Sequence, residues 1–140
     1  SEVKNILPFN FALSNKSNFV MMKEQESPHK KDYLFGTQTE SKIVNDNKDS
    51  ILKYAIKLDE IKIKKKISFI KIDCEGFELQ VLKGAKSIIK KNKPVILVEF
   101  NNNKVVSFLK FLGYKQIIQK QKSRNKLFVH INDNAFKNIL

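Results

Sequence analysis

Three carboxylate side chains follow directly on one apolar run, in the segment KIDCEGFELQVLKGA at residues 71–85. The run itself, ISFIKI at residues 67–72, is β-branched and aromatic with one lysine, which is typical of a strand covered on both faces. Asp73 then falls at the carboxyl end of the predicted strand, and Glu75 and Glu78 follow it. Open α/β sheets bind their ligands at this edge, where a carboxylate can attract a cation or take a proton from a hydroxyl. The sequence therefore predicts a ligand site around Asp73.

A second strand with an acidic end follows soon afterwards. Beyond Glu78 the apolar residues recur at helical spacing, and lysines fill the polar positions. After Pro94, the run VILVEF at residues 95–100 is again almost entirely apolar and carries Glu99 near its end. A strand, a helix and a strand joined by short turns form a parallel, right-handed unit. We therefore expect Asp73 and Glu99 to meet at one edge of the sheet.

Asp73, Glu75 and Lys71 are the candidate catalytic residues. Side chains along a strand alternate between its two faces, so Lys71 and Asp73 share one face. A salt bridge between them would keep Asp73 ionised. Asp73 is the first candidate to face the pocket, because it ends the strand. Glu75, two residues on, could orient an acceptor or act as a base.

The same acids have a purely structural use that the sequence leaves open. Asp73 could cap the following helix, while Glu75 and Glu78 could sit in its first turn, where the helix dipole favours negative charge. In that arrangement Glu78 is expected on the outer surface of the helix.

A metal site is a further alternative at this edge. Asp73, Glu99 and Asn101 together would offer hard oxygen ligands of the kind that magnesium accepts. Carboxylates at a sheet edge have several other uses, however, and Glu99 could simply bond the turn at residues 101–103. No metal is therefore assigned from these residue types.

The segment KIDCEGFELQVLKGA, followed by KPVILVEF, strongly resembles the signature of the FkbM-type methyltransferases, which transfer a methyl group from S-adenosylmethionine, mostly to hydroxyl groups. The matching positions are Lys71, Ile72, Asp73, Glu75, Gly76, Glu78, Val81, Leu82, Gly84, Ala85, Pro94 and Glu99. Looser matches are the pair Leu58 and Asp59, the run NFALS at residues 10–14, and Gly113 with Tyr114. Together they extend from about Asn5 to about Ile131.

The resemblance implies an α/β fold of Rossmann-like class I methyltransferase type, with residues 1–140 as a single partial domain. It also implies S-adenosylmethionine as cofactor, with Asp73, Asn10 and Ala12 as cofactor-binding residues. The implied reaction is O-methylation of a small-molecule hydroxyl acceptor, on a sugar, a lipid or a secondary metabolite.

The glycines of the chain indicate which part of that domain is present. A methyltransferase of this fold begins with a strand, a glycine-rich turn and a helix, because the backbone must turn tightly beside the cofactor. The four glycines here, Gly36, Gly76, Gly84 and Gly113, lie too far apart to form such a turn. We therefore expect a sheet truncated at the amino end, with the first two strands and the glycine-rich motif absent. An unpaired apolar edge of this kind predicts marginal stability.

The strongly basic composition suggests a competing interpretation. The formal net charge is +13, yet only Arg124 among the 27 basic residues is an arginine. Phosphate and base recognition relies on the planar arginine fork, and the lysines here are spread along the whole chain, so no nucleic-acid partner is expected. The alternative to the enzyme is a non-catalytic remnant or basic interaction module that does not bind the cofactor alone.

Cysteine content and apolar run lengths place limits on other classes. Cys74 is the single cysteine, so an internal disulfide and a CxxC metal pair are impossible, and we expect it to be a small packed residue. The amino-terminal residues do not resemble a signal peptide, and no apolar run reaches the length of a membrane span. A cytoplasmic protein is predicted.

The remaining elements are predicted more coarsely. Strands are expected at residues 6–13, interrupted by Pro8, at 19–22 and at 51–58; a mobile surface loop at about 23–50; a helical turn at 59–66; a helix at 104–112; and a terminal hairpin at about 114–131. The signature strand-helix-strand unit is expected at about 67–100.

Overall fold

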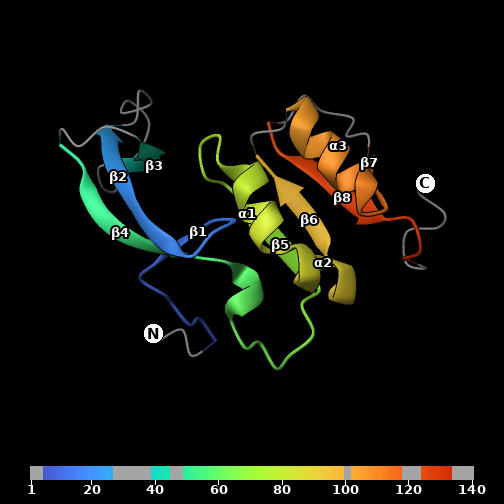
Figure 1. Cartoon of the computed structure of the whole chain (residues 1–140). Helices are drawn as coiled ribbons and strands as arrows, with labels where there is room; N and C mark the ends of the chain where they lie inside the picture. The colour runs from blue at the N-terminus through green and yellow to red at the C-terminus, as the bar shows by residue number, and fades with distance from the viewer. Residues whose placement is uncertain (1–4, 27–38, 45–48, 100–101, 118–123, 134–140) are drawn as a thin grey trace.

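The chain forms a mixed α/β structure with two four-stranded sheets. The computed structural model describes residues 5–26, 39–44, 49–99, 102–117 and 124–133. The first sheet has the strand order β1-β4-β2-β3, and the second has the order β5-β6-β8-β7. Figure 1 shows the two sheets beside each other, with β1 extending from the first sheet toward the helices that cover the second. The predicted α/β class is therefore confirmed, with the strands divided between two sheets.

The first sheet is mainly antiparallel. Strand β2 (Asn18–Glu26) pairs with both β3 (Thr39–Val44) and β4 (Ile51–Ile56), and β1 (Ala12–Leu13) adds to β4 in the parallel direction. The strand predicted at residues 6–13 is thus reduced to its last two residues. Pro8 lacks the backbone N–H that strand pairing needs. Residues 5–10 are exposed and form no strand.

The surface loop predicted at residues 23–50 is partly replaced by strand. Strand β2 continues to Glu26, and β3 pairs with it from Glu26↔Thr39 to Met21↔Val44. Residues 27–38 and 45–48 lie outside the described residues. Composition is a poor guide here because antiparallel pairing uses backbone groups, which every non-proline residue has.

The second sheet contains the predicted signature unit and the predicted terminal hairpin. Strands β5 (Phe69–Ile72) and β6 (Val95–Val98) are parallel, in the register Phe69↔Val95 to Ile72↔Val98. Strand β8 (Lys126–His130) pairs antiparallel with β6 and with β7 (Tyr114–Ile117). Strand β5 therefore forms one edge of this sheet and ends at Ile72, directly before Asp73.

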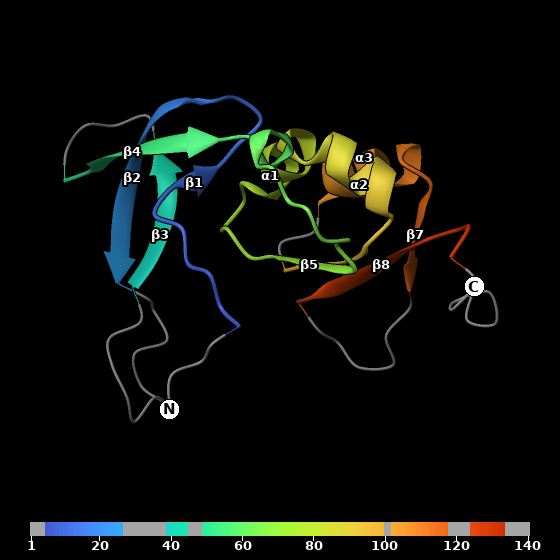
Figure 2. The same cartoon turned by 90° about the horizontal axis from the view of Figure 1, so that it is seen from below.

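Three helices cover one face of the second sheet. They are α1 (Glu78–Gly84), α2 (Lys86–Asn92) and α3 (Asn103–Phe111), and Figure 2 shows all three on the same side of β5 and β8. The single helix predicted after Asp73 is divided at Ala85, whose φ of −108° and ψ of 8° are not helical. Asn102 caps α3 by accepting from the N–H groups of Lys104 and Val105.

The core lies between these helices and the sheet. It consists of Ile72, Val81, Leu82, Ala85, Ile89, Ile96, Val98, Val105, Leu109, Leu112, Tyr114 and Phe128. The apolar runs of the signature unit contribute Ile72, Ile96 and Val98 to this cluster, which packs the carboxyl ends of β5 and β6 against the helices. None of the described helices has the length and apolar character needed to cross a bilayer.

A short 3-10 helix, η1 (Leu58–Glu60), supports α2 through one side chain. The two carboxylate oxygens of Asp59 accept hydrogen bonds from the N–H groups of Ser87 and Ile88, both at 2.9 Å. These are N–H groups of the first turn of α2, which would otherwise have no partner within the helix. Asp59 therefore acts as a helix cap from a distant part of the chain.

Replacing Asp59 with alanine is expected to lower the free energy of unfolding by about 1 kcal/mol, because two N–H groups lose their acceptor. Urea unfolding followed by circular dichroism measures this change. Lys62→Ala, at an exposed position near Asp59, is the matched control and should leave the unfolding midpoint unchanged. Equal midpoints for Asp59→Ala and wild type would show that the two bonds contribute nothing to stability.

The first sheet approaches α1 closely at Gly84. A Cβ atom at position 84 would lie 1.9 Å from the backbone oxygen of Ser14, the residue after β1. Only a residue without a side chain fits this contact, so Gly84 determines how closely the segment after β1 packs on the helix.

Gly84→Ala is therefore expected to destabilise the fold by about 1–3 kcal/mol, because the Ser14 backbone must move away. This loss should exceed the gain in helix propensity that alanine normally brings over glycine. Thermal melting measures the net effect, with Lys83→Ala at the neighbouring exposed position as control. A higher melting temperature for Gly84→Ala would contradict the close contact.

Candidate functional site

The carboxyl end of β5 places Asp73 where its carboxylate can meet other side chains. Ile72, the last residue of β5, points into the core, whereas Lys71 and Asp73 both lie on the other face. The Lys71 Nζ donates to Asp73 Oδ2 at 2.9 Å, which is the predicted salt bridge. The hydrogen bond to Asp73 raises the pKa of Lys71. Both residues remain largely exposed, so this pair orients Asp73 more than it stabilises the fold.

Asp73 does not cap the following helix. The cap position of α1 is Phe77, and no side chain bonds the helix there. The structural interpretation of Asp73 as a helix cap is therefore wrong, because the turn at residues 74–76 separates its carboxylate from the first N–H groups of the helix.

The carboxyl groups of Asp73 and Glu99 meet at this edge. The Glu99 N–H donates to the Ile72 oxygen at 3.1 Å, which continues the parallel pairing one residue beyond β6. The two carboxyl groups also lie close enough for each to shift the pKa of the other. The predicted convergence of Asp73 and Glu99 is confirmed.

This contact shifts the pKa values of the two acids in opposite directions. The hydrogen bond from Glu99, followed by that from Lys71, lowers the pKa of Asp73. The same bond, together with burial and the charges of Asp73 and Glu75, raises the pKa of Glu99. Glu99 therefore keeps its proton to a higher pH and donates it to Asp73, which stays ionised.

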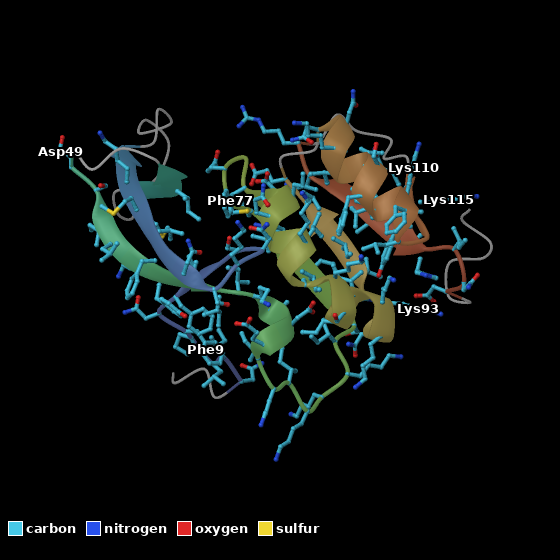
Figure 3. The ribbon with its side chains drawn as sticks, viewed as in Figure 1. Phe9, Asp49, Phe77, Lys93, Lys110 and Lys115 are labelled. Atoms are coloured by element: carbon cyan, nitrogen blue, oxygen red, sulfur yellow. The ribbon has the colours of Figure 1, made fainter. Side chains whose placement is uncertain are left out.

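A pocket of about 350 Å³ lies beside Asp73, between the two sheets. Its apolar wall includes Ala12 and Leu13 of β1 as well as Ile70 and Ile72 of β5. The charged residues among those that line it are Lys71 and Asp73. Phe77 closes one side, and Figure 3 shows it at the start of α1, on the side that faces the first sheet. The pocket is thus apolar with a single ion pair at its margin.

The structure brings together some of the other predicted site residues. Ala12 lines the pocket with Asp73. Asn10 is exposed and does not line it among the described residues; its Oδ1 accepts from the Lys53 Nζ at 3.4 Å. Glu75 is exposed in the turn after Asp73, with a positive φ of 49°, and lies close enough to Glu99 to raise the pKa of that residue.

The sequence predicted Glu78 on the outer surface of the helix, and this prediction is wrong. Its side chain is fully buried, with an exposed fraction of 0%. Helical spacing explains the correction, because Glu78 lies one and two turns before Leu82 and Ala85, and both of these are core residues. The spacing could have identified Glu78 as a buried residue from the sequence.

The structure also bears on the predicted packing of Cys74 and on the possible metal site. Cys74 is half-buried, and burial, together with the charge of Glu78, raises the pKa of its thiol to about 12, in keeping with a packed, unreactive side chain. Within the described ranges, no three His, Cys, Asp or Glu side chains form a group that could hold a metal ion. Asn101, named above as a possible ligand, lies outside them.

Residues 3–126 match the family model described as "Methyltransferase FkbM domain". A search of curated proteins gave no match. One solved structure, a methyltransferase FkbM from Methylobacillus flagellatus KT at 2.20 Å resolution, is similar with 18% sequence identity and a TM-score of 0.43. The similarity covers 77% of this chain but only 26% of that one, so the chain spans about a quarter of that protein's length. Since the family match runs through most of the residues that build the pocket and both sheets, the chain belongs to the FkbM methyltransferase domain family.

Proposed function

We propose that the chain is part of an S-adenosylmethionine-dependent methyltransferase that methylates a hydroxyl group on a sugar, a lipid or a secondary metabolite. The observation that carries this proposal is the ionised Asp73, held by Lys71 and Glu99 at the margin of an apolar pocket. Family membership supports the reaction class. The acceptor class rests on the family resemblance of the signature segment.

The residues of the pocket suit a cofactor of this kind. Small-molecule sites enclose roughly 300–1,000 Å³, and the pocket here, at about 350 Å³, lies at the lower end of that range. Its apolar wall suits a flat heterocycle, and the Asp73 carboxylate suits a cationic group. Ala12, which lines the pocket together with Asp73, leaves room for a ligand because its side chain is small.

The chain's own residues would divide the chemistry. When bound, S-adenosylmethionine supplies a methyl group on a positively charged sulfur. Asp73 would attract that charge, and Lys71 would keep Asp73 ionised and oriented. As the acceptor oxygen bonds the methyl carbon and the carbon–sulfur bond breaks, the hydroxyl proton would pass to a carboxylate, for which Glu75 is our candidate.

We also propose that this site is completed by further strands that carry the glycine-rich turn. Two features support this. Among the described strands, β5 pairs with β6 alone and β1 with β4 alone, so in this part of the chain each leaves one backbone edge open. Both open edges border the same apolar pocket. Parallel strands are normally covered on both sides, so the space between β1 and β5 suits additional strands of the same direction.

Asp73→Asn is expected to weaken S-adenosylmethionine binding by about tenfold, because the amide keeps the shape but loses the charge that attracts the cofactor. Isothermal titration of the chain measures the affinity. Asp49→Asn makes the same chemical change at an exposed position at the far tip of the first sheet, labelled in Figure 3, and serves as control. Unchanged affinity in Asp73→Asn would contradict the proposed role of this pocket.

The carboxyl pair predicts a distinct pH dependence. Glu99 has a raised pKa in the folded chain, so its contribution to stability is complete below its ordinary value of 4.5 and is lost as the pH rises through the folded value. Asp73 has a lowered pKa, so its contribution is present above 3.8 and is lost as the pH falls through the folded value. NMR titration of the side-chain carboxyl carbons should show one midpoint below 3.8 and one above 4.5.

Glu99→Gln tests the assignment, since glutamine can still donate to Asp73 but never becomes charged. The upper midpoint should disappear, and the melting temperature of the variant should rise relative to wild type as the pH increases from 4.5 to 7. Asp49→Asn, at an exposed acid away from the pair, is the control. If both carboxyl groups titrate at their ordinary values in wild type, the hydrogen bond between them is absent.

A further inference from the structure

Glu78 is a fully buried acid that the proposed reaction does not use. It is the first residue of α1, and its exposed fraction is 0%. Burying a carboxyl group is unfavourable unless its oxygens are hydrogen-bonded, and an aliphatic side chain would fill the same space without that cost. A carboxylate that only interacts favourably with the dipole at the start of a helix could do so from an exposed position. The position therefore calls for an explanation in terms of what the carboxyl group contacts.

Both described contacts of Glu78 are with the turn that carries the candidate catalytic acids. We call residues 73–77, from Asp73 to Phe77, the acidic turn. Glu78 Oε1 accepts from the Gly76 N–H at 3.0 Å and from the Cys74 thiol at 3.7 Å. The other oxygen, Oε2, is buried and has no hydrogen-bond partner. Glu78 thus binds the turn by one oxygen at two points on either side of Glu75.

The backbone of the acidic turn needs such a restraint. Glu75 has a φ of 49° and Gly76 a φ of 95°, so two consecutive residues adopt left-handed conformations. Glutamate disfavours this region, and it persists only where surrounding contacts enforce it. One backbone bond, from the Phe77 N–H to the Cys74 oxygen at 3.1 Å, closes the turn, and the two bonds to Glu78 hold it at Cys74 and Gly76.

We propose that Glu78 is a positioning residue, which holds the acidic turn in the one conformation that presents Asp73 to Glu99 and keeps Glu75 beside them. This inference rests on the proposed function, because it assigns Glu78 a role in the same site. Glu78 touches neither the pocket nor the reacting atoms; it acts through the backbone of Gly76 and the side chain of Cys74. Its buried, unpaired Oε2 is consistent with a residue retained for geometry and not for stability.

Cys74 provides a reporter of this contact that does not depend on the cofactor. Its thiol pKa of about 12 has burial as the largest cause, and the charge of Glu78 and its hydrogen bond follow. Glu78→Gln removes the charge and should lower the thiol pKa. A shift of one unit increases the thiolate fraction about tenfold at a given pH, and alkylation should accelerate accordingly. Glu75 is not among the causes of the Cys74 shift, so Glu75→Gln is the matched control.

The experiment compares the whole chain with Glu78→Gln and Glu75→Gln. Rates of Cys74 alkylation by iodoacetamide at pH 8, melting temperatures and S-adenosylmethionine affinities are measured for each. We expect Glu78→Gln to melt within a few degrees of wild type, to react about tenfold faster and to bind the cofactor about tenfold more weakly. A Glu78→Gln chain that folds normally and binds the cofactor as wild type does would overturn the positioning role.

Two further measurements decide the role of Glu78 if the variant does not fold or if the chain binds no cofactor. If Glu78→Gln does not fold, hydrogen exchange of the Gly76 amide in the wild-type chain still reports on the contact. Gly76 is exposed, so protection of its N–H requires the bond to Glu78, and free exchange would contradict the inference. If the chain by itself binds no cofactor, the alkylation rate and the Gly76 exchange still decide whether Glu78 holds the turn.

Discussion

The parallel pairing of β5 with β6 is the constraint on which the candidate site depends. In the register Ile72↔Val98, the residues that follow the two strands come side by side, and the Glu99 N–H completes the pairing at the Ile72 oxygen. The two acids thus meet because their strands run in the same direction. An antiparallel arrangement would place them at opposite ends of the sheet. The core residues of α1 and α2 then hold this edge in place from one side.

Around this pairing, the polar groups of the site are arranged in two layers. The outer layer consists of Lys71, Asp73 and Glu99, which are partly exposed. Lys71 donates to Asp73, and Asp73 and Glu99 shift each other's pKa in opposite directions. The inner layer is the single buried carboxyl of Glu78, which contacts backbone and thiol. Solvent weakens the electrostatic effects of the outer layer, whereas the inner layer lies in a medium where each hydrogen bond matters more.

Much of the second sheet could be predicted from the sequence, because its signals are local. The apolar runs that became β5 and β6 are bounded by Asp73 and Pro94, and Gly113, with a φ of 86°, ends α3 as its position suggested. The meeting of Asp73 and Glu99 followed from strand direction alone. These inferences needed only the spacing of residues within a single run and the handedness of the connection.

The misses have physical causes of their own. Strand β3 has a polar sequence, TESKIV, and is defined by its backbone partner β2, which no composition argument reveals. The capping of α2 by Asp59 joins residues far apart in the chain, so neither end indicates the other. The burial of Glu78 was overlooked because acids in a first helical turn are usually solvated, although its spacing from Leu82 indicated the core face. The roles of Asn10 and Ala12 in binding remain predictions.

The order of contacts along the chain also bears on how the molecule acquires its shape. Strands β5 and β6 are joined by two helices that pack against them, so their pairing closes a short and largely structured loop. Strand β1, in contrast, must find β4 across the whole β2–β3 hairpin, which is a longer closure with a larger entropic cost. The pairing that brings the two acids together therefore has the smaller closure cost, whereas β1, with Ala12, joins its sheet across a longer span of chain.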